Sequence, residues 1–535
     1  MNIGDLLVRS ANKFANKLAV VSETRSFTFQ ELNHRVNRLA NSLLDSGLGK
    51  GDRIGVLVHN GHQFLEIYFA SAKTGAVFCP YNNHFKQSEL KDIIDYSTPR
   101  FLSIDRDYAE MVSALKPGLK SVQKYICLQK TSLPSMDDYE TLIARSRGEE
   151  PNTKVLEDDV LSIIFTGGTT GKPKGAMRTH RHLMSNAVAG VIELKVDYDE
   201  KVMITFPMYH VACEDNIVRH SFMPNTFYIR REGAFNPEEV LAYISKERIT
   251  RCQFVPTMLH SLLLAPNIKQ YDLSSLRLIL YAASVMPVEL LKKALAVFSC
   301  GFAQLYGQTE SGPLTTVLHP EDHVLDGSPK TLARLASCGR PVINYEVRVV
   351  DDEDHDVPAG QVGEIIGRSE AMMMGYWQMP EQSAKKLRNG WLHTGDLGRM
   401  DEDGYVYMVE RKDDLIISGG VNVYPREIEE VLYGHPAVSE ASVIGLPDEH
   451  WGEVVKAVIV PKPTPMQSAI QAAGSASTAT ISVRNDQGGR LILLGSRRSR
   501  VKREIREAVK ASPPVKQNRY WKPVDPTSIK PTTGP

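Results

Sequence analysis

The chain contains 535 residues, a length that predicts several domains or subdomains and excludes a single small binding module. Hydrophobic residues make up 42% and charged residues 24%, a composition that supports sizeable cores and excludes global disorder. Lys plus Arg and Asp plus Glu each total 63, so the overall charge gives no reason to expect nucleic acid or another polyanion as a partner.

Cysteine usage and hydropathy indicate the compartment. The six cysteines lie far apart in the sequence, without the close spacing of a metal knuckle or a redox pair. Asp5 and Arg9 interrupt any apolar core of a signal peptide, and no run reaches the roughly 18 apolar residues that span a bilayer. We therefore expect a cytoplasmic protein without a transmembrane segment.

The first 150 residues alternate between helical and strand patterns. Helical spacing of apolar residues occurs at 29–46, 63–74 and 88–96, and short apolar runs typical of buried strands occur at 53–59, 76–80 and 101–104. Strands that alternate with helices predict parallel sheets covered on both faces. The same rhythm continues from about 155 to 350.

The pattern of predicted helices and strands changes around Arg340. Residues 345–350 and 363–366 predict strands of a compact β subdomain, and the polar stretch 410–414 is a candidate hinge. A helix at 425–433 and strands at 441–444 and 454–460 are predicted beyond it. After Pro463 small residues and then basic residues dominate, and we assign no elements there.

A glycine-rich loop follows the apolar run 161–165. Its sequence, TGGTTGKPKG at 166–175, combines glycines, threonine hydroxyls and lysines, which suit a loop that grips phosphate. It is not a Walker A motif, because its glycines are too closely spaced and Pro173 stands where Ser or Thr is needed. Taken alone, the stretch fits an exposed turn equally well.

Four later motifs favour the phosphate-binding interpretation over the exposed turn. They are YGQTE at 306–310, GWLHTGD at 390–396, ERKD at 410–413 and SGGVNVYPREIE at 418–429. With the loop, and in this order, they resemble the adenylate-forming superfamily of acyl- and aryl-CoA synthetases, luciferases and nonribosomal adenylation domains. The resemblance extends from the N-terminus to about residue 462.

This resemblance implies an α/β fold of the adenylate-forming type. A large AMP-binding domain, residues 1–410, should contain two parallel-type α/β sheets plus a β subdomain. A small, mobile α+β C-terminal domain should occupy residues 411–535, and Asp413 is the expected hinge between the two reaction steps.

The implied activity is that of an acyl-CoA synthetase, an AMP-forming acid–thiol ligase. ATP would convert a fatty or aryl acid to an acyl-adenylate with release of pyrophosphate, and CoA would then displace AMP. Mg²⁺ is the expected metal, CoA and the acid are the expected small-molecule partners, and a homodimer is the expected assembly. Trp451-Gly452-Glu453 resembles the CoA-synthetase version of the small domain.

The resemblance also assigns site residues. His210, in the motif FPMYH, would contact the substrate carboxylate; Tyr306 would stack on adenine, and Glu310 with Thr166 would hold Mg²⁺. Asp396 and Arg411 would bind the ribose. The full set of expected nucleotide-binding residues is Thr166, Gly167, Gly168, Thr169, Thr170, Gly171, Lys174, Ala283, Gln304, Tyr306, Gly307, Thr309, Asp396 and Arg411.

The chain departs from the family near its C-terminus. A Ser-Gly-Lys stretch that carries the catalytic lysine is expected after Pro463, but no Gly-Lys pair occurs there. By motif, that lysine position is held by Ser499, whereas by counting it falls close to Lys502, our candidate catalytic residue. We interpret 464–500 as the product of a compensated reading-frame shift, with genuine divergence as the alternative, and we predict a damaged C-terminal lobe.

Two other functions stay open: a catalytically impaired binder of nucleotide or acyl-adenylate, and an adenylation domain that loads a carrier protein. The substrate is also open between a medium or long acyl chain and a phenylpropenoate. Met208, Met258, Val285 and Met286 suggest an apolar cavity, although Val285 replaces a proline common in the family. Nucleic-acid contact by the basic tail is the less favoured alternative to a solvated surface.

Overall fold

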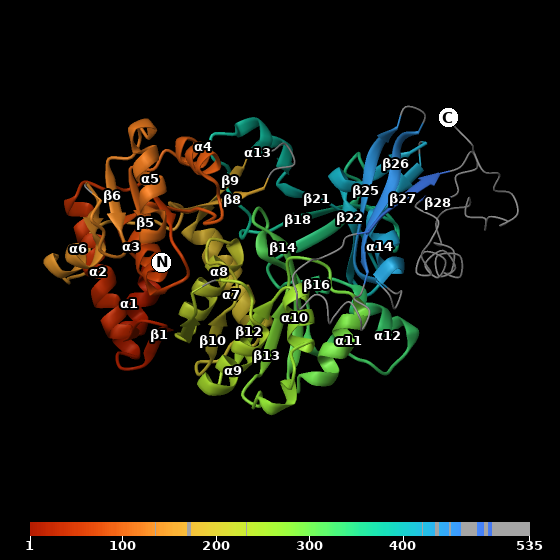
Figure 1. The fold of residues 1–535 in the computed structure, drawn as a ribbon, viewed down its shortest axis with the longest axis horizontal. Coiled ribbons are helices and arrows are strands. Elements are labelled where there is room, and N and C mark those ends of the chain that lie inside the picture. The colour runs from red at the N-terminus through yellow and green to blue at the C-terminus, as the bar shows by residue number, and fades with distance from the viewer. Residues whose placement is uncertain are drawn as a thin grey trace, which may run out of the picture. The chain divides into compact units, whose positions relative to one another are not determined.

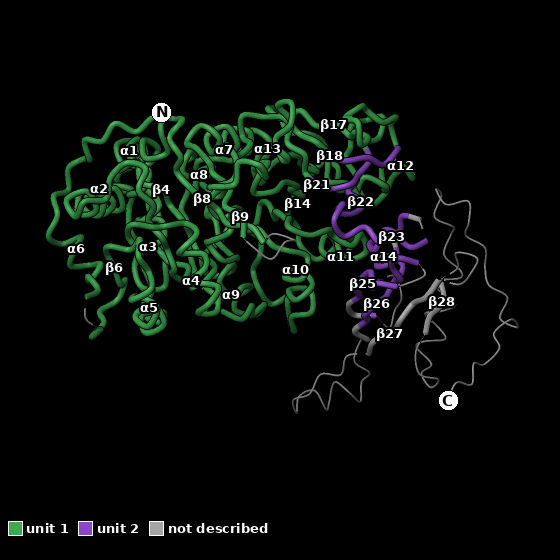
Figure 2. The backbone as a smooth tube through the Cα atoms, turned by 90° about the horizontal axis from the view of Figure 1, so that it is seen from above, with its two compact units in different colours: residues 1–360, 365–394, 400–407 green, residues 361–364, 395–399, 408–535 purple. Residues whose placement is uncertain are grey.

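A computed structural model describes residues 1–133, 135–167, 173–231, 233–419, 421–433, 438–448, 451–461, 479–485 and 491–494. Contacts divide the chain into two compact units, coloured separately in Figure 2. Unit 1 comprises residues 1–360, 365–394 and 400–407, and unit 2 comprises 361–364, 395–399 and the chain from 408 onward. The predicted loop residues Gly168, Thr169, Thr170 and Gly171, and the candidate Lys502, lie outside the described residues.

An eight-stranded sheet forms the first layer of unit 1 (Figure 1). Its order is β19 (Gly375–Tyr376), β9 (Lys174–Thr179), β8 (Val160–Thr166), β4 (Val77–Pro80), β3 (Arg53–Leu57), β5 (Phe101–Ile104), β6 (Lys124–Cys127) and β7 (Asp137–Asp138). The strands from β8 to β7 run parallel, whereas β9 and β19 are antiparallel additions.

Apolar side chains of this sheet pack on both faces. Ile54 and Phe101 join the core of α2 (Phe29–Asp45) and α3 (His62–Thr74). Leu57 and Leu102 pack on the other side with α4 (Gln87–Ser97) and α5 (Ala109–Leu115). This two-sided burial explains why the strands are short apolar runs instead of alternating ones.

A nine-stranded sheet forms the second layer. Its order is β16 (Arg340–Pro341), β15 (Gly312–Leu318), β14 (Gly301–Gln308), β13 (Leu278–Tyr281), β12 (Arg251–Phe254), β10 (Lys201–Ile204), β11 (Thr226–Ile229), β1 (Leu18–Ser22) and β2 (Ser26–Thr28). The strands from β14 to β1 are parallel, and only the edge strands β2, β15 and β16 are antiparallel.

Two helices lie between these sheets. They are α7 (His180–Glu193) and α8 (Val211–Phe222), and Ile217 of α8 shares one core cluster with Phe64 of α3. Helices α9 (Pro237–Glu247), α10 (Pro256–Leu263) and α11 (Val288–Val297) cover the opposite face of the nine-stranded sheet, with Phe254 and Phe302 in their core. Helix α8 therefore touches the apolar layers of both sheets.

A five-stranded sheet follows, with the order β17 (Glu346–Val350), β18 (Gly363–Arg368), β21 (Trp391–Met400) and β20 (Leu387–Arg388), and with β22 (Val406–Arg411) paired to β21. The division between the units falls within β18, β21 and β22. Unit 2 contains an antiparallel sheet of β23 (Ile416–Ser418), β24 (Val421–Val423), β25 (Val438–Asp448), β26 (Gly452–Pro461), β27 (Ala479–Asn485) and β28 (Leu491–Leu494), with α14 (Pro425–Tyr433).

The predicted α/β fold, with two mainly parallel sheets, a β subdomain and a small second domain, is confirmed. The expectation of no elements after Pro463 is wrong for two segments, because β27 pairs with β26 and β28 pairs with β27. Residues 479–485 alternate β-branched and polar side chains, a pattern that suits a strand. Among the described residues no helix is long and apolar enough to cross a membrane. The domain boundary at 410 stays a prediction.

Two histidines of unit 1 are held neutral. The Nδ1 atom of His180 accepts a hydrogen bond from the backbone N–H of Ile3 at 3.0 Å, and burial lowers the pKa of this imidazole to about 4. His323 lies 2.9 Å from the hydroxyl of Tyr281 and 2.7 Å from the carbonyl of His319. Burial lowers the pKa of His323 to about 4 as well.

We predict that unit 1 loses stability as the pH falls from about 6.5 to about 4. In this window the unfolded chain binds protons that the folded His180 and His323 do not bind, so unfolding is favoured by acid. Each histidine adds up to about 1.4 kcal/mol per pH unit to the slope. Urea unfolding at pH 7, 5.5 and 4.5 measures it, and His180→Gln should flatten the dependence. An unchanged slope in this variant contradicts the assignment.

Candidate active site

The carboxyl ends of four parallel strands gather the predicted motifs at one edge of the nine-stranded sheet. Phe254 at the end of β12 is in register with Tyr281 at the end of β13, which is in register with Gln304 of β14. Residues 205–210 follow β10, residues 282–284 follow β13, and residues 306–310 complete β14 and its turn. Such an edge is where open α/β sheets bind ligands.

His210 stands at the N-terminus of α8. Its side chain is exposed, and its ring centroid lies 4.5 Å from that of Tyr209. Desolvation by the surrounding protein atoms nevertheless lowers the pKa of the imidazole. The neutral ring can donate or accept a hydrogen bond, and the positive end of the helix dipole favours an anion beside it.

Ala283 adopts a backbone conformation that alanine rarely takes. Its φ is 73°, in the left-handed region, and both Ala283 and Ser284 are exposed after β13. The preceding Tyr281 is fixed by its hydrogen bond to His323. Gln304 is buried on the neighbouring strand, with its Nε2 atom 3.8 Å from the sulfur of Cys338. Local strain of this kind often accompanies functional loops.

Glu310 connects the two sheets of unit 1. Tyr376 of β19 donates a hydrogen bond from its hydroxyl to Oε1 of Glu310 at 2.7 Å. The hydroxyl of Thr166 lies 3.5 Å from the same oxygen, at the outer limit of a hydrogen bond. The backbone N–H of Met373 donates to the Glu310 carbonyl at 2.8 Å. The structure therefore brings together the two predicted metal residues.

Tyr376 is a site residue that sequence reasoning missed. It is 4% exposed, and burial together with the Glu310 carboxylate raises the pKa of its hydroxyl. Among the described residues, hydrogen bonds reach only Oε1 of Glu310, so Oε2 is available to a ligand. The motif around Tyr376 carries no local signal for this role, because the contact spans 66 positions.

The two ends of the phosphate-loop candidate are held by β8 and β9. Thr166 and Lys174 are paired in register, and the Lys174 ammonium lies 5.5 Å from the centroid of the Tyr376 ring. A Cβ atom added at Gly167 would meet nothing within 4 Å in the described part of the chain. The loop thus begins and ends beside Glu310.

Gly307 has a structural reason to be glycine. A Cβ atom there would lie 2.5 Å from the Gly312 carbonyl oxygen and 2.6 Å from the Pro313 carbonyl carbon. The pairing of β14 with β15 shifts register between Tyr306 and Gln308, which brings the two backbones together. Tyr306 is buried, and Thr309 is half-buried in the turn.

The remaining predicted residues belong to unit 2. Asp396 is 2% exposed, and Nε of Arg411 lies 3.7 Å from its Oδ1 atom. Asp413 lies in a short 3-10 helix at Lys412–Asp414. Glu410 accepts hydrogen bonds from the backbone N–H groups of Arg411 and Arg426 at 2.9 and 3.1 Å. Asp396 and Arg411 are thus adjacent, as the ribose-binding prediction requires.

The methionines that are expected to line an apolar cavity lie in different core clusters. Met208 belongs to the core cluster around α8, whereas Met286 and Met258 pack in the cluster on the opposite face of the nine-stranded sheet. These methionines fill two separate cores. The apolar cavity stays a prediction.

The chain matches two family models. The model of the AMP-binding enzymes matches residues 7–377, and the model of the AMP-binding enzyme C-terminal domain matches residues 427–485. The chain therefore belongs to the AMP-binding enzyme family, as its motifs predicted.

Individual relatives are similar over most of their length. A feruloyl-CoA synthase of an Amycolatopsis species is 36% identical over 86% of this chain and 88% of its own. A fatty acid–[acyl-carrier-protein] ligase of Streptomyces coeruleorubidus is 34% identical over 83% and 84%. The crystal structure of the anthranilate CoA ligase AuaEII with anthranoyl-AMP is 27% identical and covers 88% of this chain and 89% of its own, with a TM-score of 0.80.

The chain is thus an AMP-forming acid–thiol ligase, which activates a carboxylic acid as an acyl-adenylate and passes the acyl group to CoA. This confirms the predicted activity and the use of ATP and CoA. The individual site residues stay predictions.

We predict that Gly307→Ala destabilises unit 1 by at least about 2 kcal/mol, because its Cβ would overlap the backbone of the next strand. The matched control is Gly167→Ala, whose Cβ has open space in the described structure. Thermal unfolding of both variants gives the comparison. Equal melting temperatures of the two variants would show that the backbones of β14 and β15 can move apart to accommodate the added Cβ atom at little cost.

Proposed function

We propose that His210 contacts the substrate carboxylate and that the loop 166–174 binds the β- and γ-phosphates of ATP. The observation that carries this proposal is the cluster of Thr166, Glu310 and Tyr376 beside the carboxyl edge of the nine-stranded sheet. It puts a carboxylate oxygen, a hydroxyl and the ends of a glycine-rich loop in one place.

The residues of the cluster fit Mg²⁺, which prefers hard oxygen ligands. Glu310 offers Oε2, Thr166 offers its hydroxyl, and Tyr376 fixes the carboxylate. When bound, the ion would neutralise charge that develops on the phosphates. We assign no further step to it.

The chain's own groups would serve the adenylation half-reaction. His210 would orient the carboxylate toward the α-phosphate, Thr309 would donate a hydrogen bond to that phosphate, and Tyr306 would pack on the adenine. Asp396 would accept hydrogen bonds from the ribose hydroxyls, with Arg411 beside it. Preorganised donors of this kind stabilise the charged transition state. Asp413 stays the proposed hinge for the exchange between adenylation and thioester formation.

For the substrate, we propose a fatty or aryl acid, as in the relatives, and a role in acid metabolism. No disulfide joins any of the six cysteines, all of which lie in the described part of the chain, and this supports a reducing compartment such as the cytoplasm. Assembly as a homodimer is also proposed, and the sedimentation velocity of the purified protein measures it.

An ATP–pyrophosphate exchange assay tests the proposal, with octanoate, palmitate, benzoate and a hydroxycinnamate as acids. We expect exchange that depends on one class of acid and falls about 10²-fold in His210→Ala, because His210 orients the reacting group. Exchange that is insensitive to this change would remove His210 from the site.

Tyr376→Phe should raise the Mg²⁺ concentration for half-maximal exchange by about tenfold, because the carboxylate loses one charge-assisted hydrogen bond. The matched control is Tyr405→Phe, which removes the 2.6 Å hydrogen bond to Asp322. Titration of exchange against Mg²⁺ gives the result. The same shift in both variants would point to a general loss of stability instead.

A carrier protein is the second candidate acceptor, and the similarity to a fatty acid–[acyl-carrier-protein] ligase favours testing it. Free CoA and a phosphopantetheinylated carrier protein are compared as acceptors of the same acyl group. If the acyl group were transferred faster to the carrier protein than to CoA, the carrier protein would be the preferred acceptor.

Lys502 is our proposed adenylation lysine. Lys502→Ala should lower acyl-adenylate formation by about 10²-fold, because a positioned charge acts on the transition state, while thioester formation from preformed acyl-adenylate continues. Absence of any adenylation in the unmodified chain would instead favour the catalytically impaired binder. Ser499→Lys is the control, since the motif alignment puts the lysine there.

A further inference from the structure

Helix α8, which begins just after His210, carries several buried polar side chains. Asp215, Asn216 and Arg219 are each at most 4% exposed, although the helix lies against an apolar core. Arg219 Nη1 lies 2.5 Å from Oδ2 of Asp215, and the guanidinium packs where α7 has Gly190 instead of a larger residue. The guanidinium offers donors only, so whatever it contacts must be an acceptor.

This constraint fixes the orientation of the Asn216 amide. Arg219 Nη2 donates to Oδ1 of Asn216 at 3.0 Å. The Nδ2 atom of Asn216 therefore faces the other way, where it donates to the carbonyl of Ala212 at 2.7 Å and to Oε1 of Gln253 at 2.9 Å. The oxygen and nitrogen of an amide look alike in shape, and only the hydrogen-bond network distinguishes them.

The orientation of Gln253 follows from that of Asn216. Its Oε1 atom accepts the hydrogen bond from Asn216, so its Nε2 atom must point away. In the described part of the chain no group accepts a hydrogen bond from this nitrogen, and it is not among the fully buried unpartnered atoms. Gln253 thus presents an accessible donor, although only 8% of the residue is exposed.

The position of this donor relates it to the acid site. Gln253 lies on β12, and its backbone carbonyl accepts a hydrogen bond from the Thr205 hydroxyl, at the start of the segment that leads to His210. Its partner Asn216 is six residues beyond His210, the residue that precedes α8, so the two backbone positions are about 9 Å apart along the helix axis. An acid that extends from His210 along α8 would have its far end on the side of the Asn216–Gln253 pair.

We propose that the Gln253 amide recognises an oxygen substituent on the far end of a phenylpropenoate-type acid, an inference that rests on the proposed role of His210. The propenoate group holds the para oxygen of the ring farther from the carboxylate than it lies in a benzoate, so only the longer acid can bring this oxygen toward Gln253. The donor is the specificity-determining group of the acyl site.

A fatty acid suits this position less well. Its hydrocarbon chain would cover the Nε2 donor without accepting its hydrogen bond, and an unsatisfied buried donor is costly. A site with such a donor therefore discriminates against an acid that lacks the matching oxygen.

The test compares two acids that differ by one methoxy group: 4-methoxycinnamate, whose ether oxygen can only accept a hydrogen bond, and cinnamate. The ratio of their kcat/KM values for pyrophosphate release should be about ten in the native protein, the effect of one hydrogen bond. In Gln253→Met, which keeps the length of the side chain, the ratio should fall to about one.

Gln253→Glu is the matched control for shape. It can still accept the hydrogen bond from Asn216, but it presents an acceptor where Gln253 has a donor. The preference for 4-methoxycinnamate should be lost, while 4-hydroxycinnamate, which can donate, should keep its advantage over cinnamate.

Three other outcomes would contradict, respectively, the role of Gln253, the substrate class and the proposed function. Equal kcat/KM values for both acids in the native protein, or an unchanged ratio in Gln253→Met, would overturn the role of Gln253. Turnover of octanoate but of no cinnamate would overturn the substrate class and leave the proposed function in place. If none of the tested acids supported ATP–pyrophosphate exchange, this result would contradict the proposed function itself.

Discussion

The geometry of the candidate site depends on a buried ion pair between Arg178 and Glu214. Nη1 of Arg178 lies 2.8 Å from Oε2 of Glu214, and both side chains are almost completely buried. Arg178 belongs to β9, beside the phosphate-loop candidate, whereas Glu214 belongs to the first turn of α8, just after His210. Desolvation raises the pKa of Glu214, and the guanidinium opposes this shift. Loss of one partner would leave an uncompensated charge at a cost of about 3–5 kcal/mol, so the pair fixes the acid site relative to the phosphate loop.

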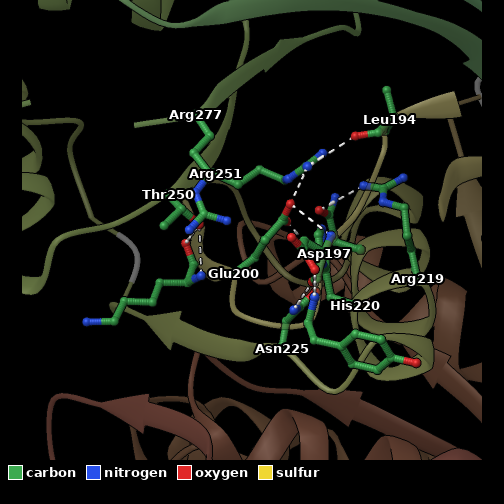
Figure 3. Close-up of polar contacts among 12 residues, drawn as sticks. Leu194, Asp197, Glu200, Arg219, His220, Asn225, Thr250, Arg251 and Arg277 are labelled. Atoms are coloured by element: carbon green, nitrogen blue, oxygen red, sulfur yellow. Dashed lines mark hydrogen bonds and ion pairs between the residues drawn. The ribbon is translucent and has the colours of Figure 1, made fainter. Parts of the chain in front are cut away.

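The other end of α8 is fixed by neutral and charged contacts together (Figure 3). Nδ1 of His220 lies 2.8 Å from Oδ1 of Asn225, whose Nδ2 atom donates to the carbonyl of Asp197. Asn225 Oδ1 is therefore an acceptor, and His220 carries its proton on Nδ1. Burial, with Arg219 and Arg251 nearby, lowers the pKa of His220 far below its ordinary value and keeps it neutral. Because both ends of the helix are held, its polar face cannot rotate away from β12.

The parts of the molecule that could be predicted from the sequence are those with a local signal. Apolar runs and helical spacing indicated strands such as β3 and helices such as α2, and the motifs indicated residues that the fold gathers at one sheet edge. The contact of Tyr376 with Glu310 has no such signal, because it depends on a two-residue edge strand pairing with β9. The donor of Gln253 was equally hidden, since its direction is decided by the partners of Asn216. Strand β27 was missed because the small-residue stretch before it obscured its alternation.

The polar layer under the acid site shows how a buried charge can set the specificity of a neutral group. Arg219 has donors only, so Asn216 must turn its oxygen toward it, and Gln253 must turn its oxygen toward Asn216. Each amide accepts a hydrogen bond through its oxygen and turns its nitrogen to the next group, so Gln253 presents a donor. The backbone carbonyl of Ala212, which can only accept, favours the same orientation because Asn216 Nδ2 donates to it at 2.7 Å. Selection at the site is thus decided by two groups that never touch the acid, because the Arg219 guanidinium and the Ala212 carbonyl together leave one orientation of the Asn216 amide.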